Sequence, residues 1–373
     1  MGLTFIEGNE AIALGAMASG CRFFAGYPIT PATTILNNML AYLPPEGGVC
    51  LQGEDEIASI GYCLGASMAG MKVMTATSGP GISLYSEQIS FAIGSEIPLV
   101  IVNIQRLGPS TGSATLGADG DIQFMRWGNS GGLPVIVLAP ANARECYELT
   151  RHAFNLAETY RCPVFIASNK EIAMTKESVD LDTFADPATV DRNASPDDCT
   201  YLPFATPESS QVPCFEPIGG DILSRQTSST HGTNGYITAD PDEIKANVER
   251  LRDKLVTDVA RFTYYDLQEA KGAQTLLITY GITTRAARAA CSRLEQAGTP
   301  CSLLSLKTLW PVPESKIIEI TEKYNRIVVV EMNLGQYVRE IERVLPGKEV
   351  TFLGQMNGKL LTPAQIERTV HHG

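Results

Sequence analysis

The feature that most constrains the fold is a repeated alternation of short apolar runs with longer helix-period segments over the first 175 residues. The apolar runs are rich in Val and Ile and lack a polar face, which is typical of strands buried on both sides. They predict strands at residues 23–26, 49–51, 73–77, 99–104, 135–139 and 164–168. The intervening segments predict helices at residues 8–19, 31–43, 54–69, 82–94 and 143–160. This alternation predicts an α/β fold with a doubly wound parallel sheet.

A second, smaller α/β unit is expected in the last part of the chain. Its strands are predicted at residues 274–280, 301–306, 326–331 and 350–353, and its helices at residues 284–296, 314–324 and 337–345. We therefore expect three parts, a first domain at 1–175, an interdomain segment at 176–262 and a second domain at 263–373.

The interdomain segment is rich in Pro, Asp, Ser and Thr up to about residue 240, which predicts a long irregular connection. Because so long a connection is unusual inside a compact domain, we expect it to lie against a partner subunit. A helix is predicted at 240–261, since Asp240-Pro241 is a helix start and apolar residues follow at helical spacing.

Composition excludes several classes of protein. The 29 basic and 41 acidic residues give a net charge of −12, which argues against nucleic acid or an anionic membrane as the main partner. No apolar run is long enough to span a membrane, and the N-terminus has no signal-peptide pattern. The nine cysteines include no C-x-x-C pair, and the four histidines form no metal-binding pattern. We expect a cytoplasmic protein with reduced thiols and no metal site of its own.

The loop after the first predicted strand, residues 26–31, has two prolines around a short polar turn. We expect Pro31 to start the next helix and Thr30 to be its N-cap. A hydroxyl at the carboxyl end of a strand, beside free helix N–H groups, suits a carboxylate or phosphate. Ordinary helix capping is the alternative.

Three acidic residues, Glu54, Asp55 and Glu56, begin the helix at 54–69. Acidic residues are favourable at the positive end of a helix, and this is enough to explain why Glu54 and Asp55 occur there. Glu56 differs because it leads into a face of Ala, Ser and Gly, against which another group packs closely. The Ser-Gly-Pro-Gly turn at 78–81 lacks the lysine of a P-loop, and we expect it to pack against a ligand ring or a partner chain.

Arg106 is the only cation in the loop at 103–112, where another strand ends. Its planar guanidinium suits a substrate carboxylate, and a structural salt bridge is the alternative. The Asp119-Gly120 pair lies in a polar loop, so it matches poorly the Gly-Asp-Gly motif that binds magnesium diphosphate in thiamin enzymes.

Together these segments resemble the α subunit of the 2-oxoacid:ferredoxin oxidoreductases, most closely the 2-oxoglutarate type. The matching segments are GYPITPAT (26–33), GEDEIAS with its small-residue tail (53–70), TATSGPGISL (75–84), IVNIQRLGPSTG (101–112), PVIVLAP (134–140), LKTLWPVPESKI (306–317) and VVVEMNLGQ (328–336). They occur in order along nearly the whole chain.

The resemblance implies a pyrimidine-binding domain of the thiamin diphosphate fold, followed by a domain similar to the transketolase C-terminal domain. The diphosphate, its Mg²⁺ and at least one [4Fe–4S] cluster then belong to a separate β subunit. In some organisms γ and ferredoxin-like δ subunits complete the complex. The implied reaction is oxidative decarboxylation of a 2-oxoacid with coenzyme A, giving acyl-CoA, CO₂ and reduced ferredoxin.

The resemblance also implies roles for individual residues. Glu56 is the catalytic residue, bound to N1′ of the aminopyrimidine, and Thr30 and Arg106 bind the substrate carboxylate. The cofactor-binding residues are Tyr27, Pro28, Ile29, Glu56, Ser78 and Gly79. The expected substrate is 2-oxoglutarate. The alternatives are pyruvate, a branched-chain or an aryl 2-oxoacid, a non-catalytic scaffold subunit, and a nucleotide-binding protein, against which the absence of P-loop and Rossmann spacing argues.

Overall fold

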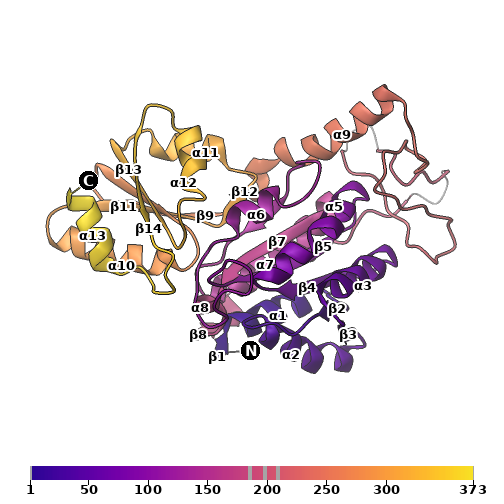
Figure 1. Ribbon diagram of the computed structural model, residues 1–373, viewed down its shortest axis with the longest axis horizontal. Helices are drawn as coiled ribbons and strands as arrows, with labels where there is room; N and C mark the ends of the chain where they lie inside the picture. Colours follow the sequence, from indigo (N-terminus) through magenta and orange to yellow (C-terminus); the bar gives the residue numbers. More distant parts are fainter. Residues whose placement is uncertain (1, 184–186, 196–199, 207–210, 373) are drawn as a thin grey trace.

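The computed structural model describes residues 2–183, 187–195, 200–206 and 211–372. These residues form a seven-stranded and a five-stranded sheet, each packed with helices, and a separate two-stranded ribbon (Figure 1). No helix among them is long and apolar enough to cross a membrane.

The seven-stranded sheet contains all six strands predicted in the first 175 residues. Its order is β12 (Thr308–Trp310), β6 (Ile136–Leu138), β7 (Pro163–Asn169), β5 (Leu99–Gln105), β4 (Val73–Thr77), β2 (Phe23–Gly26) and β3 (Val49–Gln52). Every neighbouring pair from β6 to β3 is parallel. The α/β class and the parallel sheet are therefore confirmed.

Helices cover both faces of this sheet. They are α1 (Gly8–Ala18), α2 (Thr33–Tyr42), α3 (Glu56–Met68), α4 (Pro80–Leu84), α5 (Ser86–Gly94), α6 (Ile122–Trp127), α7 (Ala143–Tyr160) and α8 (Lys170–Ala173), with a 3-10 turn η1 at Pro44–Glu46. Alternate strand residues enter two cores, one with α1, α2 and α7 and the other with α3 and α5. Because both faces are buried, the strands read as continuous apolar runs.

The five-stranded sheet has the order β14 (Glu349–Gly354), β13 (Arg326–Glu331), β10 (Thr275–Thr279), β11 (Cys301–Leu306) and β9 (Tyr265–Gln268). Its helices are α10 (Thr283–Gln296), α11 (Glu314–Thr321), α12 (Val338–Val344) and α13 (Pro363–His372). The central strands are parallel as predicted, whereas β9 is an unpredicted antiparallel edge strand. Strand β12 leaves this unit and pairs antiparallel with β6 of the first sheet.

Two predicted helices differ from their expected bounds. The helix expected at 82–94 is divided into α4 and α5 at Tyr85, whose buried hydroxyl is bonded to Thr75 Oγ1 at 2.8 Å. The helix expected at 31–43 begins only at Thr33, so the prediction that Thr30 is its N-cap is wrong. The amide of Asn9 binds the Pro31 carbonyl oxygen at 2.9 Å, and this contact with α1 holds residues 30–32 in a turn.

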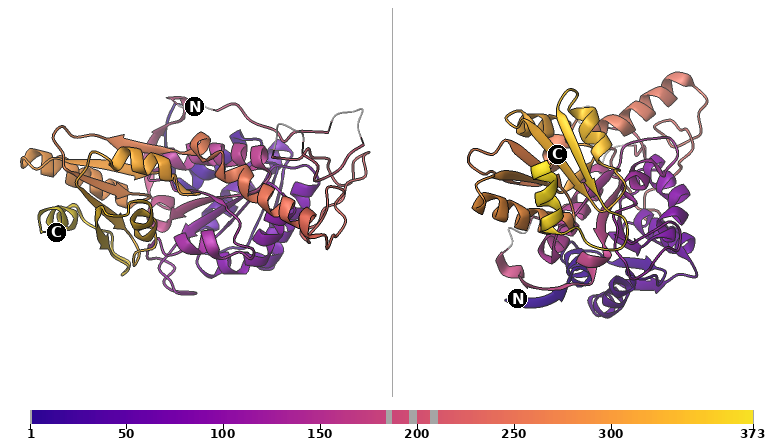
Figure 2. Two further views of the ribbon diagram at one scale, coloured as in Figure 1. Left: turned by 90° about the horizontal axis from the view of Figure 1, so that it is seen from above. Right: turned by 60° about the vertical axis from the view of Figure 1, so that its left-hand side comes forward.

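The segment expected to be irregular from residue 176 begins with a strand, β8 (Lys176–Asp180), which pairs antiparallel with β1 (Leu3–Glu7). A 3-10 turn η2 (Leu181–Thr183) follows. The helix expected at 240–261 is α9 (Pro241–Val256), followed by the 3-10 turn η3 (Val259–Phe262). Figure 2 shows the irregular part at the end of the first unit away from the second sheet, with α9 running back toward that sheet.

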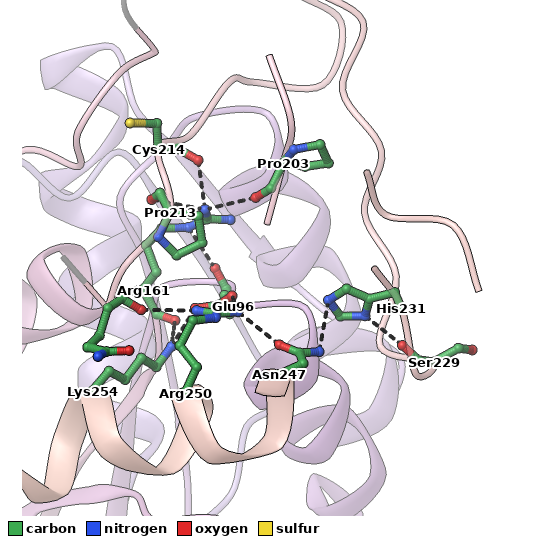
Figure 3. Close-up of polar contacts among 11 residues, drawn as sticks. Glu96, Arg161, Pro203, Pro213, Cys214, Ser229, His231, Asn247, Arg250 and Lys254 are labelled. Carbon is green, nitrogen blue, oxygen red and sulfur yellow. Dashed lines mark hydrogen bonds and ion pairs between the residues drawn. The ribbon is translucent and has the colours of Figure 1, made fainter. Parts of the chain in front are cut away.

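The described parts of the irregular segment pack on the chain's own first unit, and partner contact stays a prediction. Arg161 is almost fully buried and donates to the carbonyl oxygens of Cys214 (2.8 Å), Pro213 (3.2 Å) and Glu96 (3.1 Å) (Figure 3). Lys254 of α9 donates to the Glu96 carboxylate at 2.8 Å. The buried Arg161 side chain thus donates hydrogen bonds to backbone carbonyl groups that would otherwise lack partners.

Candidate active site

The predicted site residues lie beyond the carboxyl ends of four neighbouring strands, on loops or, for Glu56, at the first residue of α3. Tyr27 to Thr30 follow β2, Glu56 follows β3, Ser78 and Gly79 follow β4, and Arg106 follows β5. The carboxyl end of a parallel sheet is where ligands bind in α/β proteins, because the strand–helix loops converge there.

The three acidic residues at the start of α3 have different surroundings. Asp55 is the helix N-cap and accepts a hydrogen bond from the Ala58 N–H at 2.7 Å. Glu54 accepts one from the exposed Tyr62 hydroxyl at 3.0 Å. Glu56 is only 6% exposed, and no hydrogen bond to its carboxylate occurs within the described residues. Of the three, Glu56 alone is therefore a buried acid available to a ligand.

The glycines of the 78–81 turn allow close packing around Glu56 and Arg106. A Cβ atom on Gly81 would lie 2.7 Å from Glu56 Oε1, and one on Gly79 would lie 2.7 Å from Arg106 Nε. Gly79 also has a φ of +54°, which favours glycine. Any larger residue at these positions would displace the two charged side chains.

Arg106 is 5% exposed and donates through Nη1 to the Thr30 carbonyl oxygen at 2.6 Å. Burial lowers the pKa of its guanidinium, while the charges of Asp121 and Glu56 act in the opposite direction. Within the described parts of the chain, no carboxylate lies close enough to form an ion pair with Arg106. The structural salt bridge considered as the alternative is therefore not formed.

The remaining predicted residues lie on the loop after β2 and differ in exposure. Tyr27 is 37% exposed, Pro28 and Ile29 are half-buried, and the Thr30 side chain is exposed. Thr30 accepts a hydrogen bond from Arg106 through its carbonyl group, a contact that the sequence did not predict. Among the described residues, its hydroxyl forms no hydrogen bond with the Arg106 side chain.

Several buried polar atoms at the same strand ends have no partner within the described residues. They are Thr77 Oγ1, Ser78 Oγ, Asn103 Oδ1 and Arg106 Nε. Buried polar groups are almost always hydrogen-bonded, so a cluster of unpartnered ones indicates a place where a polar ligand binds. Thr77 is the last residue of β4 and Asn103 lies two residues before the end of β5. Both were missed in the sequence because a single polar residue in an apolar strand carries no signal.

Comparison with protein families is consistent with this geometry. The model of the thiamine diphosphate-binding region of pyruvate flavodoxin/ferredoxin oxidoreductase matches residues 14–250, more than half of the chain. The model of core domain II of pyruvate:ferredoxin oxidoreductase matches residues 273–366. The chain belongs to the 2-oxoacid:ferredoxin oxidoreductase family. The family identification made from the motifs is therefore confirmed.

Individual members of this oxidoreductase family are similar over nearly the full length. The 2-oxoglutarate synthase subunit KorA of Methanothermobacter thermautotrophicus is 39% identical over 366 residues, covering 97% of this chain and 96% of that protein. The 2-oxoglutarate:ferredoxin oxidoreductase from Magnetococcus marinus, solved with 2-oxoglutarate, coenzyme A and succinyl-CoA bound, is 31% identical. Its TM-score is 0.93, and the match covers 99% of this chain and 65% of the Magnetococcus chain.

The fold is also similar to that of an enzyme outside the family. A split-gene transketolase matches 99% of this chain with a TM-score of 0.57 at 14% identity. At that identity the likeness concerns the fold alone. It agrees with the expected thiamin diphosphate fold and with a second unit similar to that of transketolase.

Proposed function

We propose that this chain is the α subunit of a 2-oxoglutarate:ferredoxin oxidoreductase and forms the pyrimidine half of its thiamin diphosphate site. The observation that carries the proposal is the buried Glu56 carboxylate beside the unpartnered polar atoms of β4 and β5. The proposal keeps the division of the chain at residues 1–175, 176–262 and 263–373, with β12 as a strand of the last part that joins the first sheet.

The residues at the strand ends fit an aminopyrimidine ring. The ring is flat and carries donor and acceptor nitrogens, and the site offers a buried acid, two unpartnered hydroxyl groups and glycines that permit close approach. When bound, thiamin diphosphate supplies a carbon nucleophile and an electron sink for the decarboxylation of a 2-oxoacid.

The chain's own residues bind the aminopyrimidine ring and orient it. Glu56 shares a proton with ring nitrogen N1′, and its burial keeps water from competing for that contact. Tyr27, Pro28 and Ile29 form one wall of the ring site. Ser78 and Gly79 also contact the ring, and the buried Ser78 hydroxyl, which has no partner in the described residues, is available to it.

Arg106 and Thr30 bind the substrate carboxylate. Arg106 is buried, positively charged and without an ion-pair partner in the described residues, so an incoming carboxylate can form charge-assisted hydrogen bonds with it. Because the Thr30 carbonyl group already accepts from Nη1, it fixes the guanidinium for the remaining donors. The Thr30 hydroxyl is exposed and can turn toward the ligand.

The other components belong to partner subunits. The cysteine spacing does not suit an iron–sulfur cluster, which supports placing Mg²⁺, the diphosphate and [4Fe–4S] on a β subunit. Ferredoxin, coenzyme A and, in some organisms, γ and δ subunits complete the proposed system. The names of the 39% identical relative and of the solved Magnetococcus enzyme favour 2-oxoglutarate over pyruvate, branched-chain or aryl 2-oxoacids.

The test is to purify the native complex and to assay viologen reduction with a panel of 2-oxoacids, with and without coenzyme A. We expect the largest kcat/KM with 2-oxoglutarate and no turnover without coenzyme A. A larger value with pyruvate or a branched-chain oxoacid would change the substrate and keep the family. A complex that reduces no viologen with any oxoacid would instead favour a scaffold subunit.

A further inference from the structure

Asp121 lies on a loop that is held between the two units of the chain. The neighbouring Asp119 N–H donates to the Met332 carbonyl oxygen at 2.9 Å, and Asn333 Nδ2 donates to the Asp119 carbonyl oxygen at 2.9 Å. Gln336 Nε2 also donates to the Gly120 carbonyl oxygen. The second unit therefore fixes the backbone of a loop that reaches the candidate site.

The side chain of Asp121 is fixed beside Arg106 from the first unit. Its Oδ2 accepts a hydrogen bond from Asn103 Nδ2 at 3.1 Å, and its N–H donates to Gln105 Oε1 at 2.9 Å. Both partners lie at the end of β5, directly before Arg106. The charges of Asp121 and Arg106 attract each other, but the described structure shows no ion pair between them.

A ligand carboxylate at Arg106 would therefore bring a second negative charge near Asp121. Like charges in a buried site disfavour each other, and the neutral form of Asp121 removes that repulsion. Binding and protonation then assist each other by the same factor, because linkage is reciprocal.

We propose that Asp121 couples carboxylate binding at Arg106 to the uptake of one proton, and so sets the affinity for the 2-oxoacid. The inference rests on the proposed function, in which Arg106 binds the substrate carboxylate. Asp121 acts through Arg106 and is a positioning residue in this scheme.

The surroundings of Asp121 place this proton uptake near neutral pH. Burial raises the pKa of Asp121 to about 6, against the lowering effects of the Asn103 hydrogen bond and the Arg106 charge. The charged groups that act on it or on its partner are Arg106, Asp119 and Glu56. Substrate carboxylates ionise well below this range and do not obscure it.

Asp119 provides a matched control on the same loop. Its carboxyl group is buried and accepts from Asn169 Nδ2 at 2.9 Å, and burial raises its pKa to about 7. It interacts with Glu331 and Asp121, whereas Arg106 is not among the groups that shift its pKa. An Asp→Asn change at either position is isosteric and removes one carboxyl group.

The experiment measures, in the purified complex, the inhibition constant of glutarate against 2-oxoglutarate between pH 5.5 and 8.5. In the wild type we expect the constant to rise about tenfold with pH, within the usual range of coupling. Asp121→Asn should be independent of pH and bind about tenfold more tightly at pH 8, whereas Asp119→Asn should keep a rise of similar size, displaced in pH by the loss of the Asp119 charge. The inference would be overturned if the inhibition constant of Asp121→Asn rose with pH as in the wild type, or if the inhibition constants of both variants were independent of pH.

A second measurement needs no variant. Titration calorimetry of glutarate binding to the wild-type complex at pH 6.5, in two buffers of different ionisation enthalpy, counts the protons taken up. We expect the uptake of about 0.5 proton, from a tenfold reciprocal coupling, and no uptake would refute the inference. Absence of saturable binding of any carboxylate by the wild type would refute the proposed function as well, which distinguishes the two failures.

Discussion

Two buried charged clusters lie at opposite ends of the seven-stranded sheet and differ in how completely they are paired. At the amino ends of β5 and β7, the Glu96 carboxylate accepts from Arg250 Nη2 at 2.5 Å and from Lys254 Nζ at 2.8 Å (Figure 3). At the carboxyl ends, Glu56 has no donor in the described residues and Arg106 has no carboxylate partner. Burial of charge is common to both clusters, so it does not identify a site.

The difference in pairing shows which cluster is structural. Burial raises the pKa of Glu96, but the charges of Lys254 and Arg250 outweigh it and hold that pKa at about 2. Two buried atoms, Arg161 Nη2 and Ser95 Oγ, have no partner there among the described residues, but neither belongs to a charged group left without a counter-charge. At the other end Thr77 Oγ1, Ser78 Oγ, Asn103 Oδ1 and Arg106 Nε are unpartnered. The cluster around Glu96, whose charged groups are paired, joins segments of the chain. The cluster around Glu56 and Arg106, whose charged groups are unpaired in the described residues, can bind a ligand.

The largest effect is expected from Glu56→Gln. The amide retains size and can form hydrogen bonds but cannot share a proton with N1′, so turnover should fall by ~10²–10⁴ with little change in melting temperature. The measurements are viologen reduction and C2-proton exchange of bound thiamin diphosphate.

The controls for this variant are Glu54→Gln and Asp55→Asn, expected to change only stability, by about 0.3–1 kcal/mol. If C2-proton exchange were as fast as in the wild type in Glu56→Gln and slower in Glu54→Gln, the catalytic residue would be Glu54 instead of Glu56.

Glu96→Gln should act on stability instead. It leaves Lys254 and Arg250 buried without a counter-charge, and the free energy of unfolding should fall by about 3–5 kcal/mol while the KM of the complex is unchanged. Denaturant unfolding measures the loss. Glu319→Gln, which breaks an exposed pair with Lys316, should cost less than about 1 kcal/mol. A stable Glu96→Gln variant with an altered KM would contradict the structural assignment.

Asp119 and Glu96 should respond to pH in opposite directions. Burial raises the pKa of Asp119 to about 7, so the wild type loses stability as pH rises from about 4 to above 7. Asp119→Asn should remove roughly 2–4 kcal/mol of that loss, at about 1.4 kcal/mol per pKa unit. The lowered pKa of Glu96 stabilises above pH 4.5, and this contribution is lost as pH falls toward about 2.

Unfolding curves of the wild type and Asp119→Asn at pH 5 and pH 8.5 measure this difference. We expect the variant to gain stability relative to the wild type at pH 8.5. An equal difference at both pH values would show that the Asp119 carboxyl group of the folded protein has the same protonation state at pH 5 and pH 8.5. That outcome would contradict the raised pKa.

The smallest effect is expected from Arg106→Lys, which keeps the charge and loses the planar fork of donors. The KM for the oxoacid should rise by an amount equivalent to ~1–3 kcal/mol, with little change in melting temperature. Arg161→Lys is the matched change in the opposite cluster and should lower the melting temperature without affecting KM. Loss of melting temperature with an unchanged KM in Arg106→Lys would assign Arg106 to a structural role.

The local pattern predicted the central elements closely. Strands β2, β4, β11 and β13 and helix α7 have the bounds expected from the sequence. Their residues are buried on a fixed face with a fixed period, so the apolar pattern alone specifies them. The ribbon of β1 and β8 was missed because only Ile6 and Val179 are buried along it, which leaves almost no periodic signal.

The site was predicted in part. The sequence singled out Glu56 and Arg106, because an acid before a small-residue helix and a lone cation in a neutral loop are local features. It did not predict that Asp121 lies beside Arg106, since residues 107–120 separate the two and their proximity depends on Asn103, Gln105 and the second unit. All of the site assignments, those of Glu56 and Arg106 included, stay predictions until the variants are measured.

The sequence by itself determined the α/β class, the parallel core strands and the family, because these follow from short-range periodicity and from motifs read in order. Only the tertiary structure decided that β12 returns to the first sheet, that Thr30 presents its carbonyl oxygen to Arg106, and that the irregular segment is fixed by Arg161. These features depend on which distant groups meet. A buried polar group takes the partner that the packed fold brings within reach, and no local pattern specifies that partner.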